Sequence, residues 1–288
     1  MKKTGYVAII GKTNAGKSTF LNRIIGQKIS IVSPKKQTTR ENILGILTEN
    51  NYQIIFVDTP GIHKSKNALD KSMNKQIRIA SEGVNLILYM IDATQKIDES
   101  EVSYLTHLIE KSNAEEVPVI VLISKSEIAG KAKVFEIIET LKEVKAEIIP
   151  FSTFKNMNVD LIKEKIVENL PECDYFEFSD DEITDKSIRF LVSEIIREKA
   201  LYLLNEEIPH GIAVDIIEFN EKTNEIAADI VCEKDSHKGI IIGKGGEMIK
   251  KIGSQARRDI ERLLSVKVNL KLFVKVEKNW RQKGKFDF

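Results

Sequence analysis

The stretch that decides the fold of the first half of the chain spans residues 11–19 and reads Gly11-Lys12-Thr13-Asn14-Ala15-Gly16-Lys17-Ser18-Thr19. Its first eight residues match the phosphate-loop pattern of glycine, four residues, glycine, lysine and serine. An apolar run at residues 6–10 predicts a buried strand before the loop, and helical spacing of apolar residues over 20–25 predicts a helix after it. In this context the glycines let backbone N–H groups approach a phosphate, and the start of the helix adds the positive end of its dipole. Lys17 adds a cation, and Ser18 adds an oxygen ligand for Mg²⁺. The stretch therefore predicts a nucleotide site.

Length and composition favour two soluble domains, because 288 residues with 42% apolar and 30% charged residues are ordinary values for globular proteins. The formal net charge is +1, but residues 234–288 carry fifteen Lys or Arg against six Asp or Glu, and basic charge gathers where a polyanion binds. Cys173 and Cys232 lie far apart without metal-ligand spacing, so neither a disulfide framework nor a zinc site is expected. The longest apolar stretches, 86–91 and 117–123, are too short to span a bilayer and no apolar signal segment is present, so we expect a cytoplasmic protein.

A second motif lies about forty residues after the phosphate loop. Residues 43–48 and 53–58 predict two strands joined by a turn, and the second strand runs directly into Asp58-Thr59-Pro60-Gly61. An aspartate at a strand end, followed by a glycine whose N–H can turn toward a γ-phosphate, is typical of the magnesium-sensing element of a nucleotide switch. The polar stretch 29–42 predicts a mobile loop, in which Thr38 or Thr39 closes on Mg²⁺ and the γ-phosphate.

These motifs resemble the Era family of bacterial GTPases of ribosome assembly, on Gly11 to Ser18, Gln37-Thr38-Thr39-Arg40 and Asp58-Thr59-Pro60-Gly61-Ile62-His63. The resemblance implies GTP and GDP as ligands, Mg²⁺ held by Ser18, Thr39 and Asp58, and Thr39 as the switch threonine because it precedes Arg40. Ile62 stands where Ras-like enzymes use a glutamine to orient the attacking water, and isoleucine forms no hydrogen bond, so slow intrinsic GTP hydrolysis is expected. Relatives hold a potassium ion with a phosphate-loop asparagine. Asn14 matches that asparagine, and either it serves K⁺ or it only turns the loop.

The expected strand at residues 117–124 leads into Ser124-Lys125-Ser126-Glu127, where GTPases normally carry Asn-Lys-x-Asp. By the resemblance, the acid accepts two N–H bonds from guanine, the lysine stem covers the ring, and the asparagine ties this base loop to the phosphate loop. Glu127 keeps the acceptor chemistry but is one methylene longer, and Ser124 makes fewer and shorter-reaching bonds. We therefore expect guanine to remain preferred, with affinity or selectivity reduced by about 1–3 kcal/mol. Ser152 and Thr153 occupy the place of the family's second base loop, which acts mainly through a backbone N–H.

The alternation of strands and helices over residues 1–170 predicts an α/β fold, a P-loop NTPase or G domain with a mostly parallel sheet and its ligand at the carboxyl ends of the strands. Residues 171–185 are acidic and aromatic and show neither helical nor strand period, which predicts an ordered linker. Thr184 is expected to cap the helix that begins near residue 186.

Residues 186–280 predict, in order, helix, strand, strand, helix, helix and strand, which is the order of a smaller α+β type II KH domain, and residues 281–288 form a basic tail. Gly243-Lys244-Gly245-Gly246 lies between two expected helices and matches the G-x-x-G loop that grips about four single-stranded nucleotides. Ile241 and Ile242 are expected to floor a base groove. The basic residues of the next helix form either a solvated face or a phosphate track, and we assign Lys250 and Arg257 to RNA contacts.

This second half also resembles the Era family, and the resemblance covers nearly the whole chain. It implies a monomer that binds the 3′ end of 16S ribosomal RNA and assists assembly of the small ribosomal subunit. Peripheral membrane association belongs to the family, although no residue here requires it. A non-enzymatic RNA-binding protein is the main alternative, supported only by Ser124 and Glu127. A metabolic kinase is the third reading, against which the Asp58-Thr59-Pro60-Gly61 switch and the KH-like half both argue.

Overall fold

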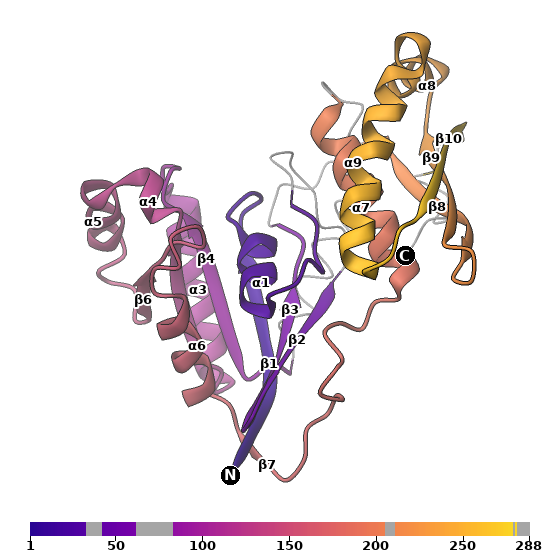
Figure 1. The fold of residues 1–288 in the computed structure, drawn as a ribbon. Coiled ribbons are helices and arrows are strands. Elements are labelled where there is room, and N and C mark those ends of the chain that lie inside the picture. Colours follow the sequence, from indigo (N-terminus) through magenta and orange to yellow (C-terminus); the bar gives the residue numbers. More distant parts are fainter. Residues whose placement is uncertain (33–41, 62–82, 205–210, 279, 281–288) are drawn as a thin grey trace. The chain divides into compact units, whose positions relative to one another are not determined.

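The computed structural model describes residues 1–32, 42–61, 83–204, 211–278 and 280, and these fall into two compact units (Figure 1). The first unit contains residues 1–29, 42–61 and 83–185, and the second contains residues 30–32, 186–204, 211–278 and 280. Among these described residues no helix combines the length and the hydropathy that crossing a membrane requires. Thr38, Thr39 and Ile62, residues 69–80, whose apolar spacing predicts a helix, and the tail 281–288 lie outside the described residues.

The first unit is built on a sheet in the order β2-β3-β1-β4-β5-β6, with β7 paired to β1. The strands are β1 (Lys2–Gly11), β2 (Ile43–Glu49), β3 (Tyr52–Asp58), β4 (Leu86–Asp92), β5 (Val119–Ser124), β6 (Glu147–Pro150) and β7 (Glu172–Cys173). β1 pairs in parallel with β3 and β4, β4 with β5, and β5 with β6, while β2 is antiparallel to β3. The predicted mostly parallel sheet is confirmed, and five strand ends therefore meet at one edge.

Helices cover this sheet on both faces, namely α1 (Lys17–Ile25), α3 (Glu99–Ala114), α4 (Ser126–Ala129), α5 (Lys131–Thr140) and α6 (Val159–Glu168). Phe20 anchors α1, because its ring packs edge-on against Phe56 of β3 and Phe151 after β6 at centroid distances of 6.3 and 5.3 Å. All three rings are fully buried. Packing of the Phe20 ring against these two rings fixes the position of α1. It thereby fixes the position of the loop that precedes α1.

Residues 171–185, which we predict to be a linker, belong to the first unit and contain a strand that their sequence did not indicate. β7 is two residues long, too short to show a period, and pairs antiparallel with the start of β1. Buried Gln53 holds the middle of the segment by accepting the N–H groups of Glu177 and Phe178 and donating to the Phe178 carbonyl. Thr184 forms a β-bridge with Gly45 on the edge strand β2, so it does not cap the next helix as expected.

The second unit packs three helices on a three-stranded sheet in the order β10-β9-β8. Its elements are α7 (Ile188–Leu203), β8 (Ala213–Asn220), β9 (Glu225–Cys232), α8 (Asp235–Ile242), the 3₁₀ turn η2 (Lys244–Gly246), α9 (Glu247–Leu264) and β10 (Asn269–Val276). Ser187 caps α7 by accepting the Phe190 N–H at 3.2 Å. The Val32 N–H donates to Glu198 of α7 at 3.1 Å, which groups residues 30–32 with this unit.

Candidate functional site

The phosphate loop leaves β1 at Gly11 and enters α1 at Lys17, with Asn14 and Gly16 in the left-handed region at φ 65° and 94°. The Lys17 ammonium is buried inside the loop and donates to the Gly11 and Lys12 carbonyls at 3.0 and 3.1 Å. Burial lowers the pKa of Lys17 to about 8, against the opposing effect of the Asp58 carboxylate. The loop is thus a preformed concave cradle with a cation at its centre, which suits an anionic phosphate chain.

Ser18 and Asp58 form the candidate magnesium site. The Ser18 hydroxyl donates to Asp58 Oδ2 at 2.8 Å, and the Asp58 side chain is fully buried at the end of β3. A hydroxyl and a carboxylate beside a phosphate cradle are the hard oxygen donors that Mg²⁺ binds through direct and water-mediated contacts. The residues present therefore fit the ion, and the third predicted ligand, Thr39, lies outside the described residues.

Thr59, Pro60 and Gly61 continue from β3 toward the phosphate loop. The Thr59 hydroxyl is buried and donates to the Ile9 carbonyl at 2.7 Å, so it ties the segment after β3 to β1. Gly61 lies so close to the loop that an added Cβ would sit 2.6 Å from the Thr13 Cα. Only glycine fits at this position beside Thr13.

The residues predicted to bind the base lie at the ends of β5 and β6. The Ser124 hydroxyl contacts the Ala15 carbonyl at 2.7 Å and the Ile91 carbonyl at 3.1 Å, so serine keeps the tether to the phosphate loop that the family's asparagine provides. Lys125, at φ 56°, donates to the Asn14 carbonyl at 2.8 Å and to Asp92 Oδ2 at 2.6 Å. The base loop and the phosphate loop are therefore joined at two points.

The Glu127 side chain has a buried oxygen atom that a ligand donor would satisfy. Its Oε2 atom is buried and has no hydrogen-bond partner among the described residues. A buried acceptor without a partner costs about 1–3 kcal/mol, so the pattern is typical of an atom that awaits a donor. The guanine N1–H and amino group are two such donors.

The second base loop is closed by its own hydrogen bonds. Ser152 and Met157 exchange N–H···O bonds at 3.1 and 3.0 Å, and the Lys155 N–H donates to the buried Ser152 hydroxyl at 3.0 Å. Ser152 is thus a structural residue of the loop, which presents Thr153 and the 82% exposed Phe154 at its tip. Sequence reasoning missed Asp92 as the partner of Lys125, although an aspartate at the end of a strand was available as a signal.

The second unit offers the G-x-x-G loop as its ligand site. Gly243, Gly245 and Gly246 all have φ between 60° and 80°, and a Cβ on Gly243 would lie 2.7 Å from the Met248 Cβ. Lys244 is exposed within this tight turn. The backbone at the start of α9 is therefore open to a close approach by a phosphodiester chain.

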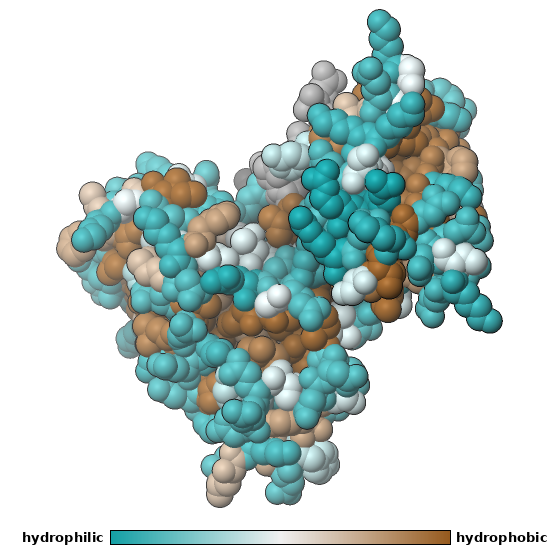
Figure 2. Space-filling view, viewed as in Figure 1, coloured by the Kyte–Doolittle hydropathy of each residue, from teal (hydrophilic) through white to brown (hydrophobic). Residues whose placement is uncertain are grey.

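A groove of about 390 Å³ lies between β10 and the N-terminal half of α9, the helix that follows this loop. Its walls combine aliphatic side chains with two cations, and the lining residues are Ile249, Lys250, Gly253, Ser254, Arg257, Leu270 and Leu272. Lys250 and Arg257 were expected here, whereas Gly253, Leu270 and Leu272 were missed. Ile241 is fully buried, so it belongs to the core instead of the groove lining, and Ile242 is half-buried. The exposed side of α9 is strongly hydrophilic (Figure 2).

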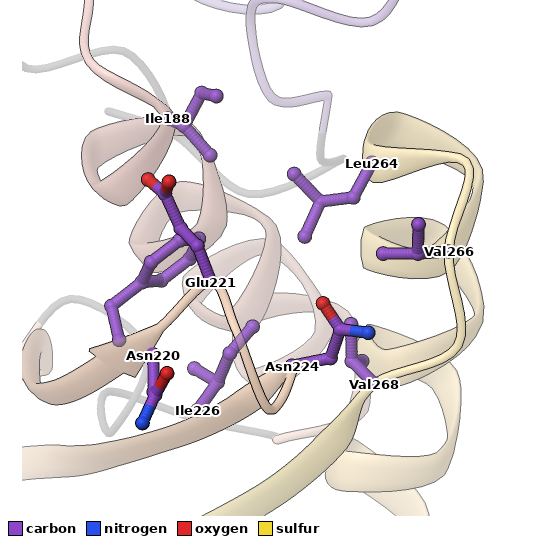
Figure 3. Close-up of a pocket in the computed structure, with 9 residues that line it drawn as sticks. Ile188, Asn220, Glu221, Asn224, Ile226, Leu264, Val266 and Val268 are labelled. Atoms are coloured by element: carbon purple, nitrogen blue, oxygen red, sulfur yellow. The ribbon is translucent and has the colours of Figure 1, made fainter.

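A second hollow, of about 160 Å³, lies at the other end of α9 (Figure 3). Ile188, Ile226, Leu264 and Val268 point toward it, with the Glu221 carboxylate at its rim. Its lining contains no Lys or Arg. A phosphate chain requires cations, so the groove at the G-x-x-G end is the candidate RNA site.

The comparisons with known proteins agree with this division of the chain. Residues 6–125 match the model of a family described as 50S ribosome-binding GTPase, and residues 207–281 match the KH domain model. GTPase Era of Clostridium botulinum (strain Kyoto / Type A2) is 48% identical, with 98% of this chain and 95% of the relative covered. GTPase Era of Clostridium beijerinckii is 47% identical over 98% of this chain and 94% of the relative.

Two solved structures match nearly the whole chain. One is Era in complex with MgGDPNP and nucleotides 1506–1542 of 16S ribosomal RNA, with a TM-score of 0.89, 41% identity and coverage of 98% of this chain and 96% of that chain. The other is a single-residue variant of Aquifex aeolicus Era bound to GDP and AlF₄⁻, with a TM-score of 0.88, 41% identity and the same coverage.

Fold and site together define a phosphate-loop GTPase domain joined to a type II KH domain. The similarity to curated relatives extends through both domains and the linker between them. The chain belongs to the Era family of GTPases.

Proposed function

We propose that the protein binds GTP, hydrolyses it slowly, and uses the nucleotide state to control binding of single-stranded ribosomal RNA during assembly of the small subunit. The observation that carries the proposal is the meeting of Lys17, Ser18, Asp58 and the unpartnered Glu127 oxygen at one edge of the sheet. Phosphate, magnesium and base contacts are thereby available to one nucleotide.

In this proposal each group has a defined task. Lys17 turns from the Gly11 and Lys12 carbonyls to the phosphates, where its charge is matched. Ser18, Asp58 and Thr39 hold Mg²⁺, which when bound neutralises charge that develops on the phosphates. Gly61 presents its N–H beside the loop, and Ile62 offers no hydrogen bond to the attacking water, so turnover is slow.

Base recognition rests on Glu127 and Thr153. The Glu127 carboxylate accepts from guanine, whereas adenine presents an acceptor at the equivalent ring nitrogen, so GTP is preferred over ATP. The Thr153 N–H serves the guanine oxygen, and the Lys125 stem covers the ring. Ser124 acts on the phosphate loop, and not on the base directly.

The proposal also includes stimulation of GTP hydrolysis by potassium. Asn14 lies in the phosphate loop at φ 65°, where its side chain can share a monovalent cation with the phosphates. Hydrolysis measured in potassium and in sodium buffers at equal ionic strength tests this assignment. Faster phosphate release in potassium, lost in Asn14→Ala, is expected, and equal rates in the two buffers would refute it.

RNA binding rests on the G-x-x-G loop and the groove between α9 and β10. The match to Era bound to nucleotides 1506–1542 of 16S ribosomal RNA supports a segment of that RNA as the ligand. Gly243, Lys244, Gly245 and Gly246 hold its backbone, Lys250 and Arg257 contact phosphates, and the aliphatic walls take the bases. We place this activity in the cytoplasm with a monomeric protein, while peripheral membrane association rests on family resemblance alone.

One experiment tests the whole proposal and its main alternative. Binding of a single-stranded 16S 3′ fragment is measured by fluorescence anisotropy with GDP and with GDPNP, and phosphate release from GTP is measured with and without the fragment. Gly245→Asp, which puts a carboxylate into the open side of the loop, should abolish RNA binding. Lys222→Glu in the β8–β9 turn lowers the net charge by two units, against one unit for Gly245→Asp, but should leave RNA binding unchanged. RNA binding without any GTP turnover would favour the alternative, a nucleotide-regulated RNA-binding protein that is not an enzyme.

A further inference from the structure

Lys12, the first variable residue of the phosphate loop, does not direct its charge into the phosphate cradle. Its ammonium binds Glu101 Oε2 at 2.8 Å and Asp98 Oδ2 at 3.1 Å, at the start of α3. Asp98 is the N-cap of that helix and accepts the Glu101 N–H at 2.8 Å and the Ser100 hydroxyl at 2.6 Å. Asp98 and Glu101 form what we call the acidic pair, which lies 86 residues or more from Lys12 along the chain.

The backbone carbonyl of Lys12 takes part in two contacts within the phosphate loop. Its carbonyl accepts the Lys17 ammonium at 3.1 Å and the Ala15 N–H at 3.3 Å, so the shape of the cradle depends on where this carbonyl stands. The next residue, Thr13, is the one that Gly61 approaches so closely. The acidic pair therefore holds the loop from outside at the residue that connects its cation and its switch contact.

The two carboxylates of the acidic pair differ in exposure. Glu101 is only 6% exposed and interacts with Lys12 and Tyr89, while Asp98 is 58% exposed. The Ser100 hydroxyl, the Glu101 N–H and Lys12 together lower the pKa of Asp98 to about 2. Burial works against the charged form of Lys12, but hydrogen bonds to Glu101 and Asp98 raise its pKa overall. A half-buried ion pair with one helix-capping partner keeps its geometry better than an exposed pair of long side chains.

We propose that Asp98 and Glu101 are positioning residues for nucleotide binding, acting through Lys12 to hold the phosphate loop in its phosphate-accepting shape before a nucleotide arrives. The inference rests on the nucleotide binding proposed above. The expected change in nucleotide affinity has the opposite sign to the change that simple electrostatics predicts. Removing the negative charge of Glu101 would strengthen binding of an anion if only the field mattered, whereas loss of positioning weakens it.

The test compares Glu101→Gln, Lys12→Met, the double variant and Lys12→Arg for binding of a fluorescent GDP analogue and of GTP. Glu101→Gln and Lys12→Met should each raise the dissociation constant about tenfold, a loss of about 1.4 kcal/mol. The double variant should be no weaker than either single variant, because both remove the same contact. Lys12→Arg, which retains the ion pair, should bind within about twofold of the wild type. Glu136→Gln removes an exposed lysine–glutamate pair on α5 and serves as the matched control.

The outcomes separate the inference from the proposed function. Positioning acts on the phosphates, so the ratio of GDP to inosine diphosphate affinity should not change in any variant, whereas a distorted base site would change it. Unchanged or tighter nucleotide binding by Glu101→Gln overturns the inference. If Glu101→Gln fails to fold, Asp98→Asn decides, because Asp98 is 58% exposed, asparagine also caps helices, and loss of the Asp98 charge weakens nucleotide binding only if the acidic pair positions the loop. A wild-type protein that binds no guanine nucleotide refutes the proposed function instead.

Discussion

Replacing Ser124 by alanine removes the hydroxyl that joins β5 to the phosphate loop. The hydroxyl lies 2.7 Å from the Ala15 carbonyl and 3.1 Å from the Ile91 carbonyl, and the residue is buried. A hydroxyl has one proton, so the substitution removes one full hydrogen bond and leaves buried carbonyl acceptors with less compensation. Such a loss costs about 1–3 kcal/mol.

The cost should appear in nucleotide binding as well as in stability. The Ala15 carbonyl belongs to the loop that receives the phosphates, and Gly16 next to it opens α1. If the whole loss acts on the bound shape of the loop, the dissociation constant for GDP rises by a factor between about 5 and 150. We expect a value near the lower end, because phosphate contacts restore part of the loop geometry in the complex.

Ser126→Ala provides a control two residues away. Its hydroxyl is also buried and donates to the Ile123 carbonyl at 2.9 Å, but it does not touch the phosphate loop. Both variants should lower the melting temperature by similar amounts, whereas only Ser124→Ala should weaken GDP binding. The measurements are titration with a fluorescent GDP analogue and thermal unfolding of the nucleotide-free protein. Equal GDP affinity of both variants would show that Ser124 is not a tether, and the reasoning would fail.

Three further outcomes follow from the two sites. Glu127→Gln replaces one carboxylate oxygen with a donor amide, so the preference for GTP over XTP should fall by at least about tenfold in nucleotide competition; an unchanged preference would exclude Glu127 from base recognition. Gly253→Val fills the groove beside Leu272, whose Cδ1 lies 3.4 Å from an added Cβ, and should raise the dissociation constant for RNA about tenfold, a loss of about 1.4 kcal/mol, without changing GTP turnover; unaltered RNA affinity would place the bases elsewhere. Burial lowers the pKa of Lys17 to about 8 in the free protein and phosphate binding favours its charged form, so GDP affinity should fall as pH rises through 8; a flat profile from about pH 7 to 9.5 would contradict this.

Local patterns indicated the candidate site of the G domain because its motifs depend on short spacing. Gly11 to Ser18 and Asp58 to Gly61 each follow a strand, and a parallel sheet brings such strand ends to one edge. The ion pair of Lys12 with Glu101 could not be predicted in this way, because nothing in either local pattern indicates which distant charge a lysine meets. The linker strand β7 was missed for another reason, since two residues cannot show a period.

In the KH unit, too, the sequence does not indicate which side chains of an element face the core. The run Ile240-Ile241-Ile242 is apolar throughout, so its sequence does not say which member faces the core, and the structure buries Ile241 completely. Two signals for the groove were nevertheless present. Gly253 interrupts a helical pattern, which indicates a close approach, and the alternation of polar and apolar residues in Asn269-Leu270-Lys271-Leu272 puts the two leucines on one face of a strand. The helix cap was misplaced because Thr184 and Ser187 are both capping residues, and the choice depends on where the linker leaves β2.

The two departures from the family's base motif act on different contacts, and this explains how one chain carries both. The Ser124 hydroxyl contacts the Ala15 carbonyl at 2.7 Å. The shorter side chain of serine, compared with asparagine, therefore affects the distance between β5 and the phosphate loop. Glu127 projects from the first turn of α4 and leaves its Oε2 atom for a ligand, so its added methylene matters for the distance to the base. Since Lys125 fixes the loop between them through Asp92 and the Asn14 carbonyl, a shift at one residue is not passed directly to the other. Their effects on GDP affinity should therefore be nearly additive, in contrast to the coupled pair of Lys12 and Glu101.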